Sequence, residues 1–364
     1  MIFAQLHNIL NYKNKYLFKK YSKAEILILN SKNIFNFPQK INLIDLGKIN
    51  LFYLLPQLFS FKDLKINYYK SLINSCSPKI IISNHIETRS LFLKKIFPEI
   101  CFILYQFCGV DESKLEILYN NLLEKEADYF FVFDNYSKNL FNKFIKSNYI
   151  INGSIFNNEL QPIIHKSLDF DILFISEYRK QNINEYYFVC HQYILNCLSE
   201  YCKINNLKLA IALSSNRTDK RHKLSKFEET SIYNNIANYV YYDNSNSYDL
   251  ASFAKVTVVL YSNIGRELLS RNFKVIYFPI YNLLKNHSLP NFLNNNNKLL
   301  WYSGIDKNII YEKITDILNI DTQDYNTYLN QNFENMKYDK GNNIFYNLIN
   351  EILLRNENYS NCTN

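Results

Sequence analysis

Short apolar runs alternate along this chain with longer segments whose apolar residues recur at helical spacing. The runs Glu25–Leu29, Lys79–Ser83 and Ile100–Gln106 have the length and apolar content of buried strands. Helical spacing is found over Leu51–Phe61, Arg89–Ile96, Ser113–Lys125 and Leu140–Ile145. Strands that alternate with helices of this length are typical of α/β layers built on a parallel sheet.

The alternation continues to about residue 280, with one interruption. Further strands are predicted at Tyr129–Phe133, Tyr149–Ile151, Asp171–Ser176, Leu207–Leu213, Val240–Asp243, Val256–Leu260 and Val275–Phe278. The segment Asn157–Leu168, which contains Pro162, breaks the pattern, and a strong strand restarts after it. We therefore expect two Rossmann-like α/β domains that face a cleft. Their predicted extents are residues 1–160 and 161–364, with the C-terminal helices counted in the second domain and expected to pack back across the junction.

The stretch Val256–Pro279 has the most specific pattern, which predicts a strand, a tight turn, a helix and a second strand. Ser262, Asn263 and Gly265 lie in the turn and the helix start, where free backbone N–H groups and the positive end of the helix dipole suit a phosphate. Glu267 follows, and a carboxylate there can accept two hydrogen bonds from a ribose diol. The alternative is an ordinary βαβ unit, whose glycine relieves packing and whose glutamate is solvated.

Polar residues follow most of the predicted strands at their carboxyl ends. Because ligands of such sheets bind outside these ends, the polar residues there are the candidate site. The candidate donor ligands in this group are Gly153, Ser154, Asn157, Ser176, Arg179 and Arg217. A polar residue at a strand end is also a common turn former, and this alternative stays open for each of them.

His85 and Glu87 follow the predicted strand Lys79–Ser83 and form the candidate catalytic pair. A carboxylate at a strand end, aimed into a cleft, can act as a general base or as a nucleophile. His85 can tune or share its proton, or it can be a hydrogen-bonded turn residue.

Composition and charge narrow the class of protein. The chain has 364 residues, 48% of them hydrophobic, which suits two domains with a large core. The net charge of +8 is spread without a basic arm or a nucleic-acid motif, so we expect no nucleic-acid partner. No apolar stretch approaches about 18 residues and no signal-peptide pattern is present, so we expect a cytoplasmic protein. A peripheral contact with the inner membrane stays open. The cysteines and histidines show no metal-ligand spacing, so we expect no metal.

A family resemblance is carried by four places in the chain. They are PKIIISNHIE (Pro78–Glu87) with YQFCG (Tyr105–Gly109), then Ala127–Asn158, Asp171–Arg179 and Ser247–Phe278. In order and pattern they resemble the bacterial surface-carbohydrate biosynthesis proteins, a GT-B-like group akin to transferases that use CMP-activated keto sugars such as Kdo. The last segment looks like the donor-site segment of that group. This chain differs from the pattern at Glu87, Tyr261 and Asn272, where the group tends to have aspartate, aspartate and glycine.

The resemblance implies a function. It implies a glycosyltransferase of surface polysaccharide synthesis, capsule or lipopolysaccharide, with residues 1–160 as acceptor and catalytic domain and 161–364 as nucleotide-sugar domain. The implied donor is a CMP-linked keto sugar, the implied acceptor a glycan or glycolipid, and no cofactor or metal is required. Two alternatives stay open: an enzyme like a nucleotide-sugar 2-epimerase, and a non-catalytic scaffold of a glycan assembly complex.

Overall fold

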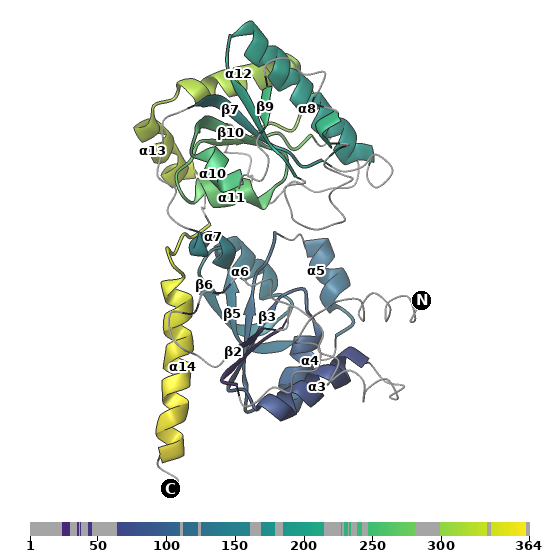
Figure 1. Cartoon of the computed structure of the whole chain (residues 1–364), viewed down its shortest axis with the longest axis vertical. Coiled ribbons are helices and arrows are strands. Elements are labelled where there is room, and N and C mark those ends of the chain that lie inside the picture. The colour runs from purple at the N-terminus through teal and green to yellow at the C-terminus, as the bar shows by residue number, and fades with distance from the viewer. Residues whose placement is uncertain are drawn as a thin grey trace.

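The computed structural model describes most of the chain. The described residues are 24–29, 35, 37, 43–45, 64–109, 112–122, 125–160, 169–178, 185–214, 227, 229–231, 233, 239–241, 247–280, 299–332 and 336–361. They form two α/β domains that lie one above the other in Figure 1. Each domain is built on one sheet, and every strand pairing in both sheets is parallel.

The first domain contains a six-stranded sheet in the order β2-β1-β3-β4-β5-β6. Its strands are β1 (Ile26–Leu29), β2 (Leu43–Asp45), β3 (Ile80–Asn84), β4 (Cys101–Tyr105), β5 (Glu126–Val132) and β6 (Lys146–Ile151). The helices that connect them are α3 (Leu64–Cys76), α4 (Arg89–Ile96), α5 (Glu112–Tyr119) and α6 (Asn135–Phe141), and α7 (Ile155–Glu159) follows the last strand.

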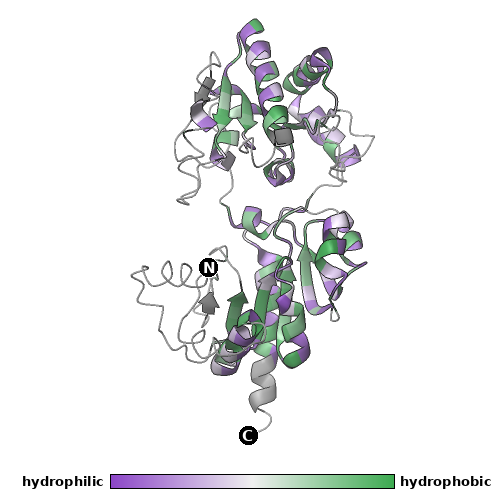
Figure 2. Ribbon diagram, turned by 90° about the vertical axis from the view of Figure 1, so that its right-hand side faces the viewer, coloured by the Kyte–Doolittle hydropathy of each residue, from purple (hydrophilic) through white to green (hydrophobic). Residues whose placement is uncertain are grey.

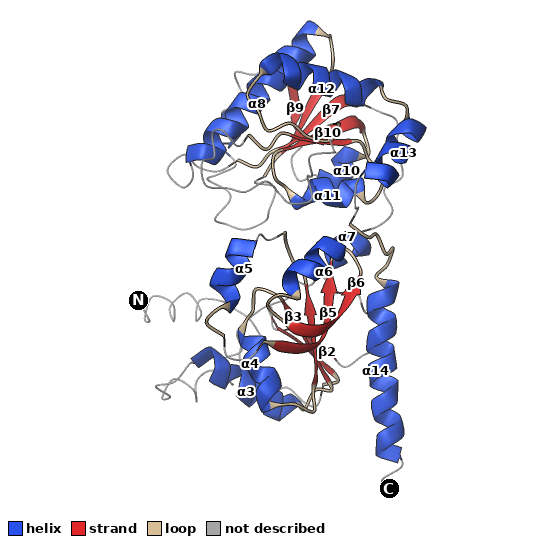
Figure 3. Cartoon of the chain, turned by 180° about the vertical axis from the view of Figure 1, so that it is seen from behind, coloured by secondary structure: helices blue, strands red, loops and turns tan. Residues whose placement is uncertain are grey.

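The second domain contains a five-stranded sheet in the order β11-β10-β7-β8-β9. Its strands are β7 (Phe170–Ile175), β8 (Leu209–Ala212), β9 (Tyr239–Tyr241), β10 (Ala254–Val259) and β11 (Val275–Tyr277). Its helices are α8 (Glu185–Ile204), α10 (Ser247–Ala251), α11 (Asn263–Leu269), α12 (Lys307–Asn319) and α13 (Thr322–Asn332). Figure 3 shows helices on both sides of this sheet.

The central strands are apolar along their whole length because helices cover both faces of the sheet. All four residues of β1 are buried, and the apolar strands of the first sheet appear green in Figure 2. Alternate residues of a strand point to opposite faces. Leu27 accordingly packs in one cluster with residues of α3 and α4, while Ile26 and Ile28 pack in another with the C-terminal helix.

That C-terminal helix, α14 (Asn343–Asn361), packs on the first sheet. Phe345, Ile349 and Leu353 recur every four residues and form one apolar stripe against β1, β3 and β4. The chain therefore crosses back from the second domain, and α14 covers the face opposite α3 and α4 (Figure 1). The sequence predicted that the C-terminal helices pack back across the junction, as α14 does, but its pattern gives only the apolar stripe of this helix and not the sheet that receives it. The boundary between residues 160 and 161 stays a prediction.

Most predicted elements are present, with a few corrections. Each predicted strand is found, and β2, α3, α7 and α13 are additional elements that the pattern did not indicate. Helix α6 begins at Asn135, earlier than predicted, because Asp134 caps it by accepting a hydrogen bond of 2.7 Å from the Ser137 N–H. The helix predicted near Leu51–Phe61 lies outside the described residues. The α/β class of two Rossmann-like domains is confirmed.

Candidate functional site

The two domains meet where helix α11 of the second faces the loops after β5 and β6 of the first. Arg266 of α11 forms an ion pair with Asp134, at the end of β5, and both side chains are buried. The guanidinium group also lies 5.7 Å from the centre of the Phe133 ring. Removing one partner of a buried ion pair strongly destabilises a protein, because the other charge is left buried without a counter-charge. Arg266 therefore holds the domains together.

Glu267 is next to this pair and is also buried, with 6% of its surface exposed. One carboxylate oxygen accepts a 2.5 Å hydrogen bond from the Ser154 hydroxyl of the first domain, and the other accepts one from the Tyr248 hydroxyl. Burial raises the pKa of the Glu267 carboxyl, and the two hydroxyl donors oppose that effect. The structure thus brings two predicted donor ligands, Ser154 and Glu267, into direct contact. A ribose diol would have to replace hydroxyls that the carboxylate already binds.

Asn157 belongs to the same junction. Its side-chain amide donates to the Ser270 hydroxyl at 3.2 Å, and its backbone carbonyl oxygen accepts a hydrogen bond from the Arg271 guanidinium. That guanidinium lies 4.6 Å from the centre of the Tyr338 ring, on the segment that leads back to α14. Asn157 therefore ties α7 to the end of α11.

Gly153 has a backbone role that explains its residue type. Its φ is +78°, and a β-carbon placed there would lie 1.7 Å from the Lys337 carbonyl oxygen. A β-bridge joins Gly153 to Tyr338, so the returning chain passes directly over it. Only glycine fits both constraints.

The turn between β10 and α11 is held by a carboxylate. Oε1 of Glu177, which follows β7, accepts the N–H groups of Leu260, Tyr261 and Ser262 at 2.9, 2.6 and 2.8 Å. Three consecutive N–H groups that converge on one point form an anion-binding nest. Here the anion is a side chain of the protein, which the sequence placed at a strand end without indicating that this turn would reach it.

Two of the three residues predicted to approach a phosphate, Ser262 and Gly265, form local hydrogen bonds. Ser262 caps α11 and accepts from the Ile264 N–H, and the Gly265 N–H donates to the Ser262 carbonyl at 3.1 Å. A β-carbon on Gly265 would lie 2.4 Å from the Tyr277 hydroxyl, so this glycine permits close packing of helix on strand. Asn263 faces the first domain, with Oδ1 2.8 Å from the place of a β-carbon on Gly109.

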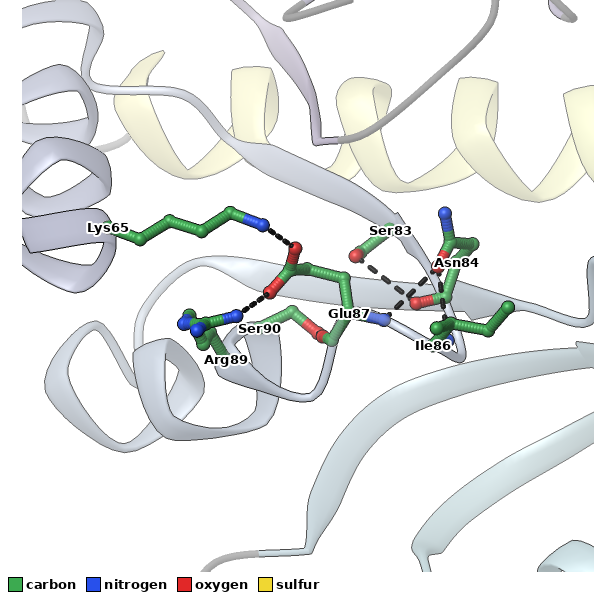
Figure 4. Close-up of polar contacts among 7 residues, drawn as sticks. All are labelled: Lys65, Ser83, Asn84, Ile86, Glu87, Arg89 and Ser90. Atoms are coloured by element: carbon green, nitrogen blue, oxygen red, sulfur yellow. Dashed lines mark hydrogen bonds and ion pairs between the residues drawn. The ribbon is translucent and has the colours of Figure 1, made fainter. Parts of the chain in front are cut away.

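Glu87 lies in a charged cluster on the first domain (Figure 4). Its carboxylate forms ion pairs with Lys65 and, at 3.4 Å, with Arg89, and it accepts a hydrogen bond from the Tyr69 hydroxyl. The side chain is buried while both cations are about 40% exposed, at 40% and 42%. These partners fix the orientation of the Glu87 carboxylate at the edge of the first domain.

His85 has separate contacts, and no hydrogen bond between it and Glu87 is present. Its Nδ1 accepts the Phe107 N–H at 3.1 Å, so the ring proton is on Nε2, which has no hydrogen-bond partner. The ring lies edge-on to Phe141. Burial lowers the pKa of His85 to about 4, so the imidazole is neutral at pH 7. The predicted catalytic pair is therefore near in sequence but not coupled by contact.

Ser176 belongs to a buried polar cluster within the second domain. Its hydroxyl donates to Glu229 and lies 3.0 Å from Nε2 of His191 and 2.8 Å from the Tyr233 hydroxyl. Glu229 also accepts from Tyr233 at 2.9 Å and from the Ser214 N–H at 3.0 Å. The cluster satisfies a buried carboxylate at the ends of β7 and β8.

Arg179 and Arg217 lie outside the described residues. Among the residues that are described, no three histidine, cysteine, aspartate or glutamate side chains gather as a metal site would require. No helix in the same part of the chain is long and apolar enough to span a bilayer.

The family is decided by sequence comparison. Residues 117–353 match the family described as "putative O-antigen biosynthesis protein". The chain belongs to this O-antigen biosynthesis family. No curated protein sequence matches it.

Solved structures show the fold. The wall teichoic acid polymerase TagF is 12% identical with a TM-score of 0.53, over 97% of this chain and 85% of that one. The UDP-GlcNAc 2-epimerase of Methanocaldococcus jannaschii, in complex with UDP-GlcNAc and UDP, is 12% identical with a TM-score of 0.53. The match covers 90% of this chain and 98% of that one. S. aureus MnaA with UDP is 10% identical with a TM-score of 0.52, and the match covers 79% of this chain and 80% of that one. The fold is GT-B, and the expected membership of a surface-carbohydrate biosynthesis family is confirmed.

Proposed function

We propose that this protein is a glycosyltransferase that transfers a sugar from a nucleotide donor to a growing bacterial surface glycan. Membership of the O-antigen biosynthesis family, on a GT-B fold, carries the proposal. The fold is shared with a wall teichoic acid polymerase, whose name also describes an enzyme that builds a surface polymer. We further propose a cytoplasmic location beside the membrane, where donor and acceptor meet.

The donor that we propose is a CMP-linked keto sugar, following the resemblance of Ser247–Phe278 to a donor-site segment. The segment Ser262–Gly265 would lie beside its phosphate and Glu267 beside its ribose. For that, the Ser154 and Tyr248 hydroxyls must release Glu267, so donor binding would be coupled to the domain junction. Ser176, Arg179 and Arg217 complete the proposed donor side. We propose no metal, because a CMP leaving group has one phosphate that cationic side chains can balance.

In the proposed reaction the acceptor hydroxyl attacks the anomeric carbon, and the bond from that carbon to the CMP phosphate breaks. The phosphate oxygen keeps the electron pair, and Glu87 takes the hydroxyl proton as general base. Lys65 and Arg89 would position Glu87 for this step, since both contact its carboxylate. His85, neutral at pH 7, would act as a hydrogen-bond donor through Nε2.

The second candidate is an epimerase. It is favoured by the likeness to the M. jannaschii UDP-GlcNAc 2-epimerase, which covers 98% of that chain. A non-catalytic scaffold is the third candidate, and it is favoured by the Glu177 carboxylate in the nest of the donor turn.

One experiment separates the three. The purified chain is incubated with CMP- and UDP-sugars, with and without a glycolipid acceptor, and nucleotide release and sugar identity are measured. A transferase releases the nucleotide in quantity only with the acceptor. Turnover of the sugar to its epimer without acceptor identifies the second candidate, and absence of both reactions identifies the scaffold.

The role of Glu87 has a matched control. Glu87→Gln should lower transfer by about 100-fold or more, the usual contribution of a general base. Glu112→Gln removes an exposed carboxylate paired with Lys143 at 2.7 Å and should leave transfer unchanged. A folded Glu87→Gln protein with full activity excludes Glu87 from the role.

A further inference from the structure

Helices α3 and α4 have an unusual charge pattern. Their sequences, LKINYYKSLINSC and RSLFLKKI, contain five basic residues and no acidic one. Lys94 is engaged by Asp128 at 2.8 Å, while Lys65 and Arg89 pair with the buried Glu87. The two carboxylates in these ion pairs, Glu87 and Asp128, are fewer than the five cations of the two helices, so the surface of the helices is positive.

The two helices lie side by side on one face of the first sheet (Figures 1 and 3). Tyr68, Leu72 and Ile73 of α3 and Leu93 of α4 are buried in the core beneath them. Lys70 of α3 lies 5.7 Å from the centre of the Phe92 ring of α4, so the outward sides of the helices are in contact.

Large apolar side chains stand among the cations on this outward side. Phe92 is 41% exposed and Leu64 is 40% exposed. Phosphate groups of a nucleic acid would attract the cations, but they offer no apolar surface on which a phenyl ring or a leucine side chain could be buried. The boundary between headgroups and acyl chains of a bilayer suits both kinds of side chain, because apolar groups insert while lysines remain with the anionic headgroups.

We propose that the α3–α4 surface, formed by Leu64, Lys65, Lys70, Arg89, Phe92 and Lys95, docks the protein on a bilayer that contains anionic lipid. This contact is independent of the proposed reaction, because it needs neither donor nor acceptor. It would hold the first domain at the membrane with Glu87, which contacts Lys65 and Arg89 of the same surface, close to lipid-linked molecules.

The test is flotation of the full chain with phosphatidylcholine vesicles, with or without about 30% phosphatidylglycerol. Binding is expected only with the anionic lipid, and it should weaken as salt screens the charges. Lys70→Glu with Lys95→Glu should weaken partition by about 30-fold or more, since each basic residue near the surface contributes about 1 kcal/mol and 1.4 kcal/mol is tenfold. Neither residue belongs to the proposed catalytic or donor site.

Two further variants test the apolar contribution to binding and the effect of net charge. Phe92→Ser should lower the binding that survives at high salt, because it removes the inserting ring. The control, Lys203→Glu with Lys340→Glu, makes the same change in net charge at exposed positions elsewhere and should bind as the wild type does. Equal losses in the control and the α3–α4 variant would overturn the proposal. So would binding to neutral vesicles alone, or tighter binding to single-stranded RNA than to the anionic vesicles at the same salt.

Discussion

The Ser154 hydroxyl of the first domain donates a 2.5 Å hydrogen bond to the Glu267 carboxylate of the second. Tyr248 donates to the other carboxylate oxygen, so one buried glutamate joins the cap of α7 to helix α11. The residue that sequence assigns to donor ribose is, in this arrangement, a contact between domains. Under the proposed function, a donor ribose that engages Glu267 would compete with the Ser154 and Tyr248 hydroxyls, so donor binding would be coupled to the domain arrangement.

Ser154→Ala should lower the free energy of unfolding by about 1–3 kcal/mol, because it removes a donor to a buried charged group. Denaturant unfolding near pH 7 measures it. The matched variant is Ser147→Ala, also in the first domain, whose hydroxyl has no hydrogen-bond partner. If the two variants unfold at the same denaturant concentration, the Ser154–Glu267 contact contributes nothing.

The contact also predicts a pH dependence. Burial raises the pKa of Glu267 above its ordinary value of 4.5. The folded state therefore binds the proton more tightly than the unfolded state, and this contribution to stability is lost as pH rises through the raised pKa. Glu267→Gln removes it, so its stability relative to the wild type should improve as pH rises above about 4.5. Unfolding curves from pH 4 to 8 check the sign; a constant difference would contradict it.

Arg266→Met should destabilise the protein by about 3–5 kcal/mol, because it leaves the Asp134 carboxylate buried without its cation. Arg266→Met combined with Asp134→Asn should recover part of that loss, since asparagine can still cap α6 and carries no charge. Urea unfolding of the two single variants and the double variant gives the coupling free energy between Arg266 and Asp134. Purely additive effects would mean that the two side chains do not interact.

Glu177→Ala should destabilise by about 3 kcal/mol, because three backbone N–H groups lose a charged acceptor. It should also change nucleotide binding at the β10–α11 turn, which calorimetry with CMP measures. Glu177→Gln is the control, since its carbonyl oxygen can still accept those N–H groups. A thermal unfolding midpoint for Glu177→Ala equal to that of the wild type would exclude Glu177 as the support of this turn.

Most strands were predictable because they contain buried apolar runs, as in Ile80–Ile82 or Val258–Leu260, and a parallel sheet covered on both faces requires such runs. The turn after β10 was predictable for the same reason, since it separates two such runs. Helix α3 was not, because its buried residues include Tyr68 and Tyr69 among polar neighbours and give a weak pattern.

The contacts between domains could not be predicted from sequence. Asp134 and Arg266 are 132 residues apart, and Ser154 and Glu267 are 113 apart. Each side chain was recognisable as a polar residue near a strand end, but only the packing of α11 against the first domain decides which of them meet. Glu177 illustrates the same limit, because a strand-end carboxylate fits a ligand, a metal or its own chain equally well.

Two glycines with the same backbone conformation but different surroundings give a sharper test. Gly153 has φ +78° and the Lys337 carbonyl 1.7 Å from the place of a β-carbon, whereas Gly341 has φ +75° and nothing within 4 Å. Gly341→Ala should lose only the strain of a left-handed backbone, about 1–3 kcal/mol.

Gly153→Ala should lose that amount and more, because the returning chain must move away from β6 and α7, and with it the approach to α14. Thermal unfolding of both variants measures the difference, and calorimetry with CMP shows whether Gly153→Ala affects a ligand in protein that stays folded. Equal melting temperatures for the two variants would mean that the segment at Lys337 does not pass over Gly153. A stable Gly153→Ala protein with weakened CMP binding would instead return this glycine to the donor site.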